Sequence, residues 1–119
     1  RCCLPAEALT RLLDEAGEND EGGILAIPVA DTLKRSDGSH HIDETVARAG
    51  LWQAQTPQLF QTALLHRALS VDDLSEITDE ASAVEKLGIR PRLVQGDTRN
   101  LKLTLPQDEY IVRLLLKAV

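Results

Sequence analysis

The sequence predicts an α/β protein, and three observations favour this class. Helical and strand-like segments alternate along the 119 residues, which is typical of a mostly parallel sheet covered by helices. The apolar run at 24–29 has no polar alternation, as expected of a strand buried on both faces of such a sheet. A hydrophobic content of 43% suits one small globular domain. We therefore expect residues 1–119 to belong to a single domain.

The first expected element is a helix over 5–16, followed by the strand at 24–29. Proline is favoured at the first position of a helix, and Pro5 stands there. Helical spacing gives this segment one apolar face, formed by Leu9, Leu12, Leu13 and Ala16. Pro28 predicts that the strand leaves the sheet there, because proline cannot donate a ladder hydrogen bond.

A polar hairpin is expected next, over roughly residues 28–48. Asp37-Gly38 between two strand-like segments is a hairpin signal. These strands are too polar to form a core. We therefore expect a projecting β-arm that embraces a partner subunit.

The stretch 45–60 holds the only tryptophan and the only phenylalanine of the chain, together with several polar residues. We interpret it as a strand that ends near Gln55 and passes into a helix, with Thr56 as N-cap and Pro57 at the first position. Such corners often carry ligands in α/β proteins. Trp52 and Phe60 are expected to be packing residues.

The remaining segments are expected to form two helices and two short strands. The first helix follows Thr78 as N-cap, and Gly88 ends it; its inner face comprises Ala81, Val84 and Leu87. Strand-like pieces are expected at 91–94 and 101–104. Pro106 is expected to start the last helix, whose inner face comprises Ile111, Leu114, Leu115 and Ala118.

Charge and composition exclude several classes. A net charge of −6 argues against a general nucleic-acid binder, which needs a basic face. The apolar runs are shorter than the ~20 residues that span a bilayer, and no signal peptide is visible, so we expect a cytoplasmic protein. Adjacent Cys2 and Cys3 do not form a disulfide framework, and His40 and His41 are expected to be exposed turn residues.

A phosphate pocket is the chemistry that the polar residues favour. Thr56 and Thr78 each stand before an expected helix, where free N–H groups and the helix dipole attract anions. Arg48 and Lys102 could complete a phosphomonoester site if they converge with these threonines. The alternatives are simple capping for each threonine and a solvated surface charge for each cation. Asp79 and Glu80 are interpreted as first-turn acids that favour the helix dipole.

Four ordered segments carry a resemblance to a known family: GGILAIPVADTLKR, TVARAGLWQAQTPQLF, ITDEASAVEKLG and RLVQGDTRNLKLTLPQD. The chain closely resembles the C-terminal half of 2-C-methyl-D-erythritol 4-phosphate cytidylyltransferases. The resemblance implies a Rossmann-like nucleotidyltransferase fold, a three-layer sandwich, and a homodimer clasped by the β-arm. It also implies a reaction in which CTP and methylerythritol phosphate give CDP-methylerythritol and pyrophosphate with Mg²⁺, in non-mevalonate isoprenoid biosynthesis.

The resemblance also implies roles for individual residues. Thr32 and Arg48 would reach across the dimer to the methylerythritol phosphate, which Thr56 and Thr78 would contact from the other subunit. Lys102 would lie near the reacting phosphates as a catalytic residue. Arg1 matches an arginine that also lies near the substrate.

The resemblance places the CTP-binding loop and the Mg²⁺-binding aspartate upstream of Arg1. We therefore expect this chain to be inactive and aggregation-prone without an N-terminal portion. Two alternatives stay open: a cytidylyltransferase for another polyol phosphate, such as ribitol phosphate, and a non-catalytic dimerisation fragment.

Overall fold

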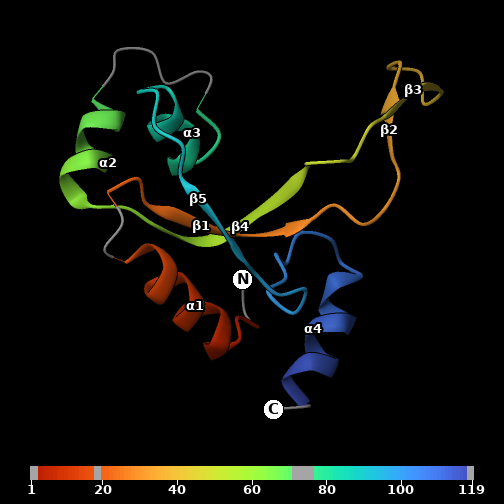
Figure 1. Ribbon diagram of the computed structural model, residues 1–119. Helices are drawn as coiled ribbons and strands as arrows, with labels where there is room; N and C mark the ends of the chain where they lie inside the picture. Colours follow the sequence, from red (N-terminus) through yellow and green to blue (C-terminus); the bar gives the residue numbers. More distant parts are fainter. Residues whose placement is uncertain (1–2, 18–19, 71–76, 118–119) are drawn as a thin grey trace.

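A three-stranded sheet with the order β4–β1–β5 lies at the centre of the chain (Figure 1). The structure is a computed structural model that describes residues 3–17, 20–70 and 77–117. Strand β1 (Gly23–Pro28) pairs parallel with β5 (Arg92–Gln95) and antiparallel with β4 (Trp52–Leu59). The expected mostly parallel sheet is therefore mixed, because the chain returns from β1 to β4 through a hairpin and not through a crossover helix.

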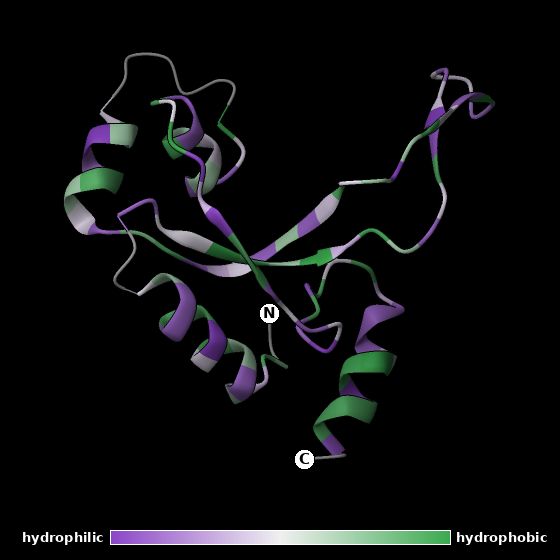
Figure 2. Cartoon of the chain, viewed as in Figure 1, coloured by the Kyte–Doolittle hydropathy of each residue, from purple (hydrophilic) through white to green (hydrophobic). Residues whose placement is uncertain are grey.

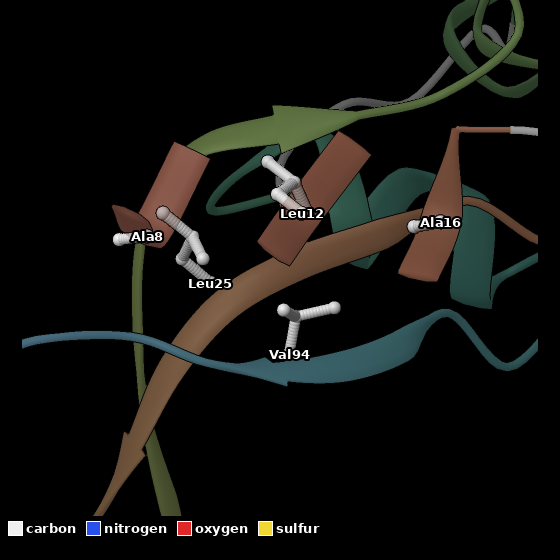
Figure 3. Packing of buried hydrophobic residues seen from close by; sticks show 5 residues of the cluster. All are labelled: Ala8, Leu12, Ala16, Leu25 and Val94. Atoms are coloured by element: carbon white, nitrogen blue, oxygen red, sulfur yellow. The ribbon is translucent and has the colours of Figure 1, made fainter. Parts of the chain in front are cut away.

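Helices cover both faces of this sheet. Helix α1 (Ala6–Ala16) packs on one face, where Leu12 joins Leu25 of β1 and Val94 of β5 (Figure 3). Helices α2 (Thr62–Leu69) and α3 (Glu80–Glu85) lie on the other face, where Ala81 packs against Ile24 and Ala26. Successive residues of β1 thus point into two different cores, which confirms the strand buried on both faces and the three-layer sandwich.

The predicted hairpin forms a separate two-stranded sheet, which we call the β2–β3 arm (Figure 1). It consists of β2 (Leu33–Ser36) and β3 (Ile42–Val46), and Gly38 adopts a φ of 90° in the turn between them. The arm projects from the body, which accounts for a radius of gyration of 16.5 Å. A compact domain of this length has about 13.5 Å. The role of the arm in dimerisation stays a prediction.

The prediction that a helix begins at Pro57 is wrong. Strand β4 continues through Thr56 and Pro57, which a cis peptide bond joins, and still pairs with β1 where Leu59 lies opposite Gly23. Helix α2 begins only at Thr62. Pairing with β1 overrides the local helix-start signal here. Helix α2 still packs into the body, since Leu64 and Ala68 are buried and Phe60 packs against their cluster.

The faces expected for the first and last helices are only partly correct. In α1, Pro5 is the N-cap and lies before the first helical residue, and Leu9 and Leu13 are exposed while Ala8 is buried. Helix α4 (Asp108–Lys117) buries Val112, but Ile111 and Leu114 are exposed, contrary to prediction. Figure 2 shows the apolar residues that run along α4. Ala118 lies outside the described residues.

Helix α3 and strand β5 occupy the predicted segments, and Ala81 and Val84 are buried as expected. The prediction of a strand at 101–104 is wrong. That segment has no regular secondary structure and follows a turn in which Leu101 N donates to Arg99 O. Within the described ranges, the helices are too short or too polar to cross a membrane.

Candidate functional site

One cleft brings together three of the predicted site residues from distant parts of the chain. It has a volume of about 410 Å³, and its lining residues are Ala54, Gln55, Thr56, Gln58, Thr78, Asp79, Glu80 and Lys102. Thr56 comes from β4, Thr78 precedes α3, and Lys102 follows the loop after β5. We call this site the Thr–Lys cleft. Two hydroxyl donors and an ammonium group facing one space suit a phosphomonoester.

The two threonines line this cleft, but neither of them caps a helix as predicted. Thr56 lies in a strand, so it caps no helix. Asp79, and not Thr78, is the N-cap of α3: its Oδ1 accepts from Ser82 N at 2.8 Å, and the Ser82 hydroxyl accepts from Asp79 N at 3.2 Å. Ala81 N donates to Gln58 Oε1 at 3.0 Å. These N–H groups are engaged within the protein, and the two threonine hydroxyls and the Lys102 ammonium are the side-chain groups of the cleft suited to bind an anion.

The carboxylate of Asp79 is structural, as expected of a residue at a helix start. Its Oδ2 accepts from Gln58 Nε2 at 2.8 Å, and its Oδ1 serves the cap. Gln58 therefore fastens the start of α3 to β4 with two hydrogen bonds, one to Asp79 and one from Ala81. This contact sets Thr78 beside Thr56, and the sequence alone did not reveal it.

The loop that leads to Lys102 is stiffened by charge. Arg99 donates to Asp97 through its side chain at 2.9 and 2.8 Å, and Arg99 N donates to Asp97 Oδ1 at 2.8 Å. The side-chain hydrogen bond from Arg99 lowers the pKa of Asp97 to about 2. From the opposite direction, Arg11 Nε of α1 donates to Gln95 O at 2.9 Å. The loop is thus held before any ligand arrives.

Thr32 and Arg48 lie elsewhere, at the base of the β2–β3 arm. Leu33 pairs with Val46, so Thr32 and Arg48 flank the same end of the arm, and both are exposed. Neither lines the Thr–Lys cleft. Arg1 lies outside the described residues.

The other predicted residues have plain structural positions. His40 and His41 are exposed in the arm, as expected. Phe60 packs against two buried clusters on its face of the sheet, which confirms it as a packing residue, whereas Trp52 is 38% exposed. Within residues 3–17, 20–70 and 77–117, no group of three or more His, Cys, Asp or Glu residues could hold a metal ion.

Comparison with known proteins agrees with this fold. A profile of the 2-C-methyl-D-erythritol 4-phosphate cytidylyltransferase family matches residues 1–118. Similar proteins of that name include one from Neisseria gonorrhoeae, 73% identical over the whole chain and 52% of its own length. Another, from Thiobacillus denitrificans, is 54% identical over 98% of the chain and 51% of its own length.

Solved structures extend the likeness to the fold. A 4-diphosphocytidyl-2C-methyl-D-erythritol synthase structure matches with a TM-score of 0.90 and 72% identity, over 98% of this chain and 52% of that one. The Thermus thermophilus 2-C-methyl-D-erythritol 4-phosphate cytidylyltransferase matches with a TM-score of 0.85 and 30% identity, over 96% and 56%. The fold is thus that of nucleotidyltransferases. The chain belongs to the 2-C-methyl-D-erythritol 4-phosphate cytidylyltransferase family.

The chain spans about half the length of the curated relatives it matches. Its assignment to their C-terminal half stays a prediction.

Proposed function

We propose that the protein to which this chain contributes transfers a cytidylyl group from CTP to 2-C-methyl-D-erythritol 4-phosphate. The products are CDP-methylerythritol and pyrophosphate. The observation that carries the proposal is the Thr–Lys cleft, in which Thr56, Thr78 and Lys102 meet from three separate segments. Membership of the cytidylyltransferase family supplies the reaction class.

In this reaction an oxygen of the methylerythritol phosphate attacks the α-phosphorus of CTP. The bond from that phosphorus to the oxygen of the β-phosphate breaks, and pyrophosphate leaves with its electron pair. Catalysis of such a transfer consists mainly of positioning and charge neutralisation. The Thr56 and Thr78 hydroxyls are suited to donate to the attacking phosphate, and Lys102 is suited to balance the charge that gathers on the phosphates.

A second subunit completes the proposed site. Thr32 and Arg48 lie together at the base of the β2–β3 arm, outside the Thr–Lys cleft of their own chain. A homodimer in which each arm reaches over its partner would bring these two residues to the partner's cleft. Arg48 would then add a planar, bidentate donor to the same phosphate.

Magnesium is the ion that this family's chemistry implies. The described residues offer no group of three or more His, Cys, Asp or Glu that could hold it. We expect its aspartate ligand to lie upstream of Arg1, as the resemblance implies.

The test uses protein assembled at the full length of its relatives, beside the 119-residue chain alone. We expect the full-length protein to release pyrophosphate when CTP, Mg²⁺ and methylerythritol phosphate are all present, and the short chain to release none. Ribitol phosphate, assayed side by side, tests the alternative substrate and should turn over more slowly. Full-length protein that releases no pyrophosphate with either substrate would favour the non-catalytic dimerisation fragment.

A further inference from the structure

Strand β4 carries a glutamine that neither its strand position nor the proposed substrate contacts explain. Gln55 is only 6% exposed, and a buried amide is costly unless its hydrogen bonds are made. Its Nε2 donates to Asp97 O at 3.1 Å, and its Oε1 accepts from Asp97 N at 3.4 Å. Both bonds run to the loop after β5, so Gln55 fastens that loop to the strand.

Asn100 completes this connection from the loop side. It is 1% exposed, and its Nδ2 donates to the backbone oxygen of Thr56 at 2.7 Å and to Gln55 Oε1 at 3.4 Å. The short bond ends on the residue whose hydroxyl is proposed to bind the phosphate. Lys102 follows only two positions later in the chain.

The packing around this pair leaves little freedom. A side chain on Gly96 would collide with Gln55 Oε1, so the loop passes directly against the amide. Gly96 N also donates to Ala26 O at 2.8 Å, which ties the loop to β1. The loop between Gly96 and Asn100 is therefore tied to both β1 and β4.

We propose that Gln55 and Asn100 are positioning residues that hold Lys102 at the distance from Thr56 that phosphoryl chemistry requires. The proposal rests on the proposed function, because Lys102 and Thr56 are taken to bind the same reacting phosphates. These two residues lie on separate segments, and the amide pair links those segments directly. A displacement of about 1 Å can lower a rate ~100-fold in such a site.

The test is a double-mutant cycle in full-length protein, with Asn100→Asp and Lys102→Ala as the two changes. Asn100→Asp keeps the shape of the side chain, removes both donated hydrogen bonds and sets a carboxylate against the Thr56 carbonyl. We expect kcat to fall about 10- to 100-fold, with KM for methylerythritol phosphate changed less than about 3-fold.

The cycle separates positioning from simple destabilisation. If Asn100 acts through Lys102, adding Asn100→Asp to Lys102→Ala should lower kcat by less than about 2-fold more. If the kcat loss of the double variant equals the product of the two single losses, the positioning role is overturned while the proposed function stays intact. Should Asn100→Asp not fold, as judged by thermal unfolding, Gln55→Glu takes its place, since it removes only the donation to Asp97 O.

A matched control comes from the opposite end of the sheet. Gln61→Glu is the same kind of amide-to-carboxylate change at an exposed hydrogen bond, from Gln61 Nε2 to Asp20 at 3.1 Å. It should leave kcat unchanged within about 2-fold. An equal loss in this control would overturn the proposal.

Affinity for inorganic phosphate, measured by calorimetry, gives a readout that does not need catalysis. Unsubstituted protein that binds phosphate but releases no pyrophosphate would overturn the proposed function. In that case, Asn100→Asp should weaken phosphate binding in the parent and not in the Lys102→Ala background. Equal weakening in both backgrounds, or none in either, would overturn the positioning role.

Discussion

At the scale of single residues, the Thr–Lys cleft combines two neutral hydroxyl groups with one ammonium group. A threonine hydroxyl can donate one directed hydrogen bond to a phosphate oxygen, whereas Lys102 supplies charge with little directional demand. The two threonines are therefore expected to govern how the substrate is oriented and held. Lys102 is expected to act mainly on the reacting phosphates.

Removing the Thr56 hydroxyl tests this division. We expect Thr56→Val in full-length protein to raise KM for methylerythritol phosphate about 10- to 100-fold, the cost of one hydrogen bond to a charged group. Valine suits a strand and nearly keeps the shape, so β4 should persist. Thr56→Ser keeps the hydroxyl and is the matched control for steady-state kinetics. Equal kinetics for the valine and serine variants would contradict a donor role.

The Asp97–Arg99 pair makes a prediction about pH. The pKa of Asp97 falls from 3.8 to about 2 on folding, so its contribution is complete above pH 3.8 and is lost as pH falls towards 2. Because the Arg99 side chain is 56% exposed, this contribution is at most about 1 kcal/mol.

We therefore expect Asp97→Asn to lower the free energy of unfolding at neutral pH by up to about 1 kcal/mol, and the difference to shrink between pH 4 and pH 2. Denaturant unfolding at several pH values measures it, and added salt should reduce it at pH 7. A difference that stays constant from pH 7 to pH 2 would contradict the ion pair as its source.

At the scale of elements, α3 is a short helix of 6 residues whose position depends on its first turn. Asp79 closes a capping box with Ser82, and Gln58 ties the same turn to β4. The cap residue Asp79 is thus adjacent to Thr78, which is proposed to bind substrate, and mutations can separate the two effects.

Asp79→Ala removes the cap, so we expect the free energy of unfolding to fall by about 0.5–2 kcal/mol. Thr78→Val should leave that free energy within about 0.5 kcal/mol, because Thr78 is exposed, while KM for methylerythritol phosphate rises. Thermal unfolding and steady-state kinetics on both variants provide the measurement. A larger stability loss for Thr78→Val than for Asp79→Ala would mean that the cap is misassigned.

The elements that sequence predicted well are those whose signals are local. The apolar run of β1 and the Asp37-Gly38 turn each depend on neighbouring residues, and each is present. Helix α3 ends at Glu85, and Gly88 lies in the turn that follows it. The Thr56-Pro57 pair was misread because a threonine before a proline is a typical helix start. Pairing of β4 with β1, which joins residues 24 to 36 positions apart, decides its structure instead.

The residues of the cleft were predictable only in part. Resemblance to a family pointed to Thr56, Thr78 and Lys102, and the fold brings them together. Gln55, Gln58 and Asn100 were missed, because their partners lie 21 to 45 positions away in the chain. The available signal was the presence of several glutamines in a strand that otherwise suits a core, and it did not say what they contact.

At the scale of the whole molecule, the proposed site is divided between two chains. Thr32 and Arg48 stand on the arm, and the Thr–Lys cleft is in the body. One variant with a defect at the arm and one with a defect in the cleft should therefore regain activity when their subunits are combined in one dimer.

With methylerythritol phosphate well below the KM of the variants, we expect Arg48→Ala and Thr56→Val to be nearly inactive as separate full-length homodimers. After mixed refolding, half of the dimers are heterodimers with one intact site each, so about a quarter of the unsubstituted activity should return. Refolding each variant alone is the control. Absence of any recovery, with heterodimers demonstrated by differently tagged subunits, would show that each site is built from a single chain.

The core beneath α1 also has a consequence for the order in which the chain acquires its structure. Ala8, Leu12, Ala16 and Leu25 belong to the first quarter of the sequence, yet Val94 completes their cluster (Figure 3). A ribosome that adds ~5–20 residues per second needs several seconds to deliver Val94 after Leu25. During that interval the apolar side of α1 has no β5 to cover it. Synthesis speed between these positions, and any chaperone that shields nascent apolar surface, should therefore influence the yield of folded protein.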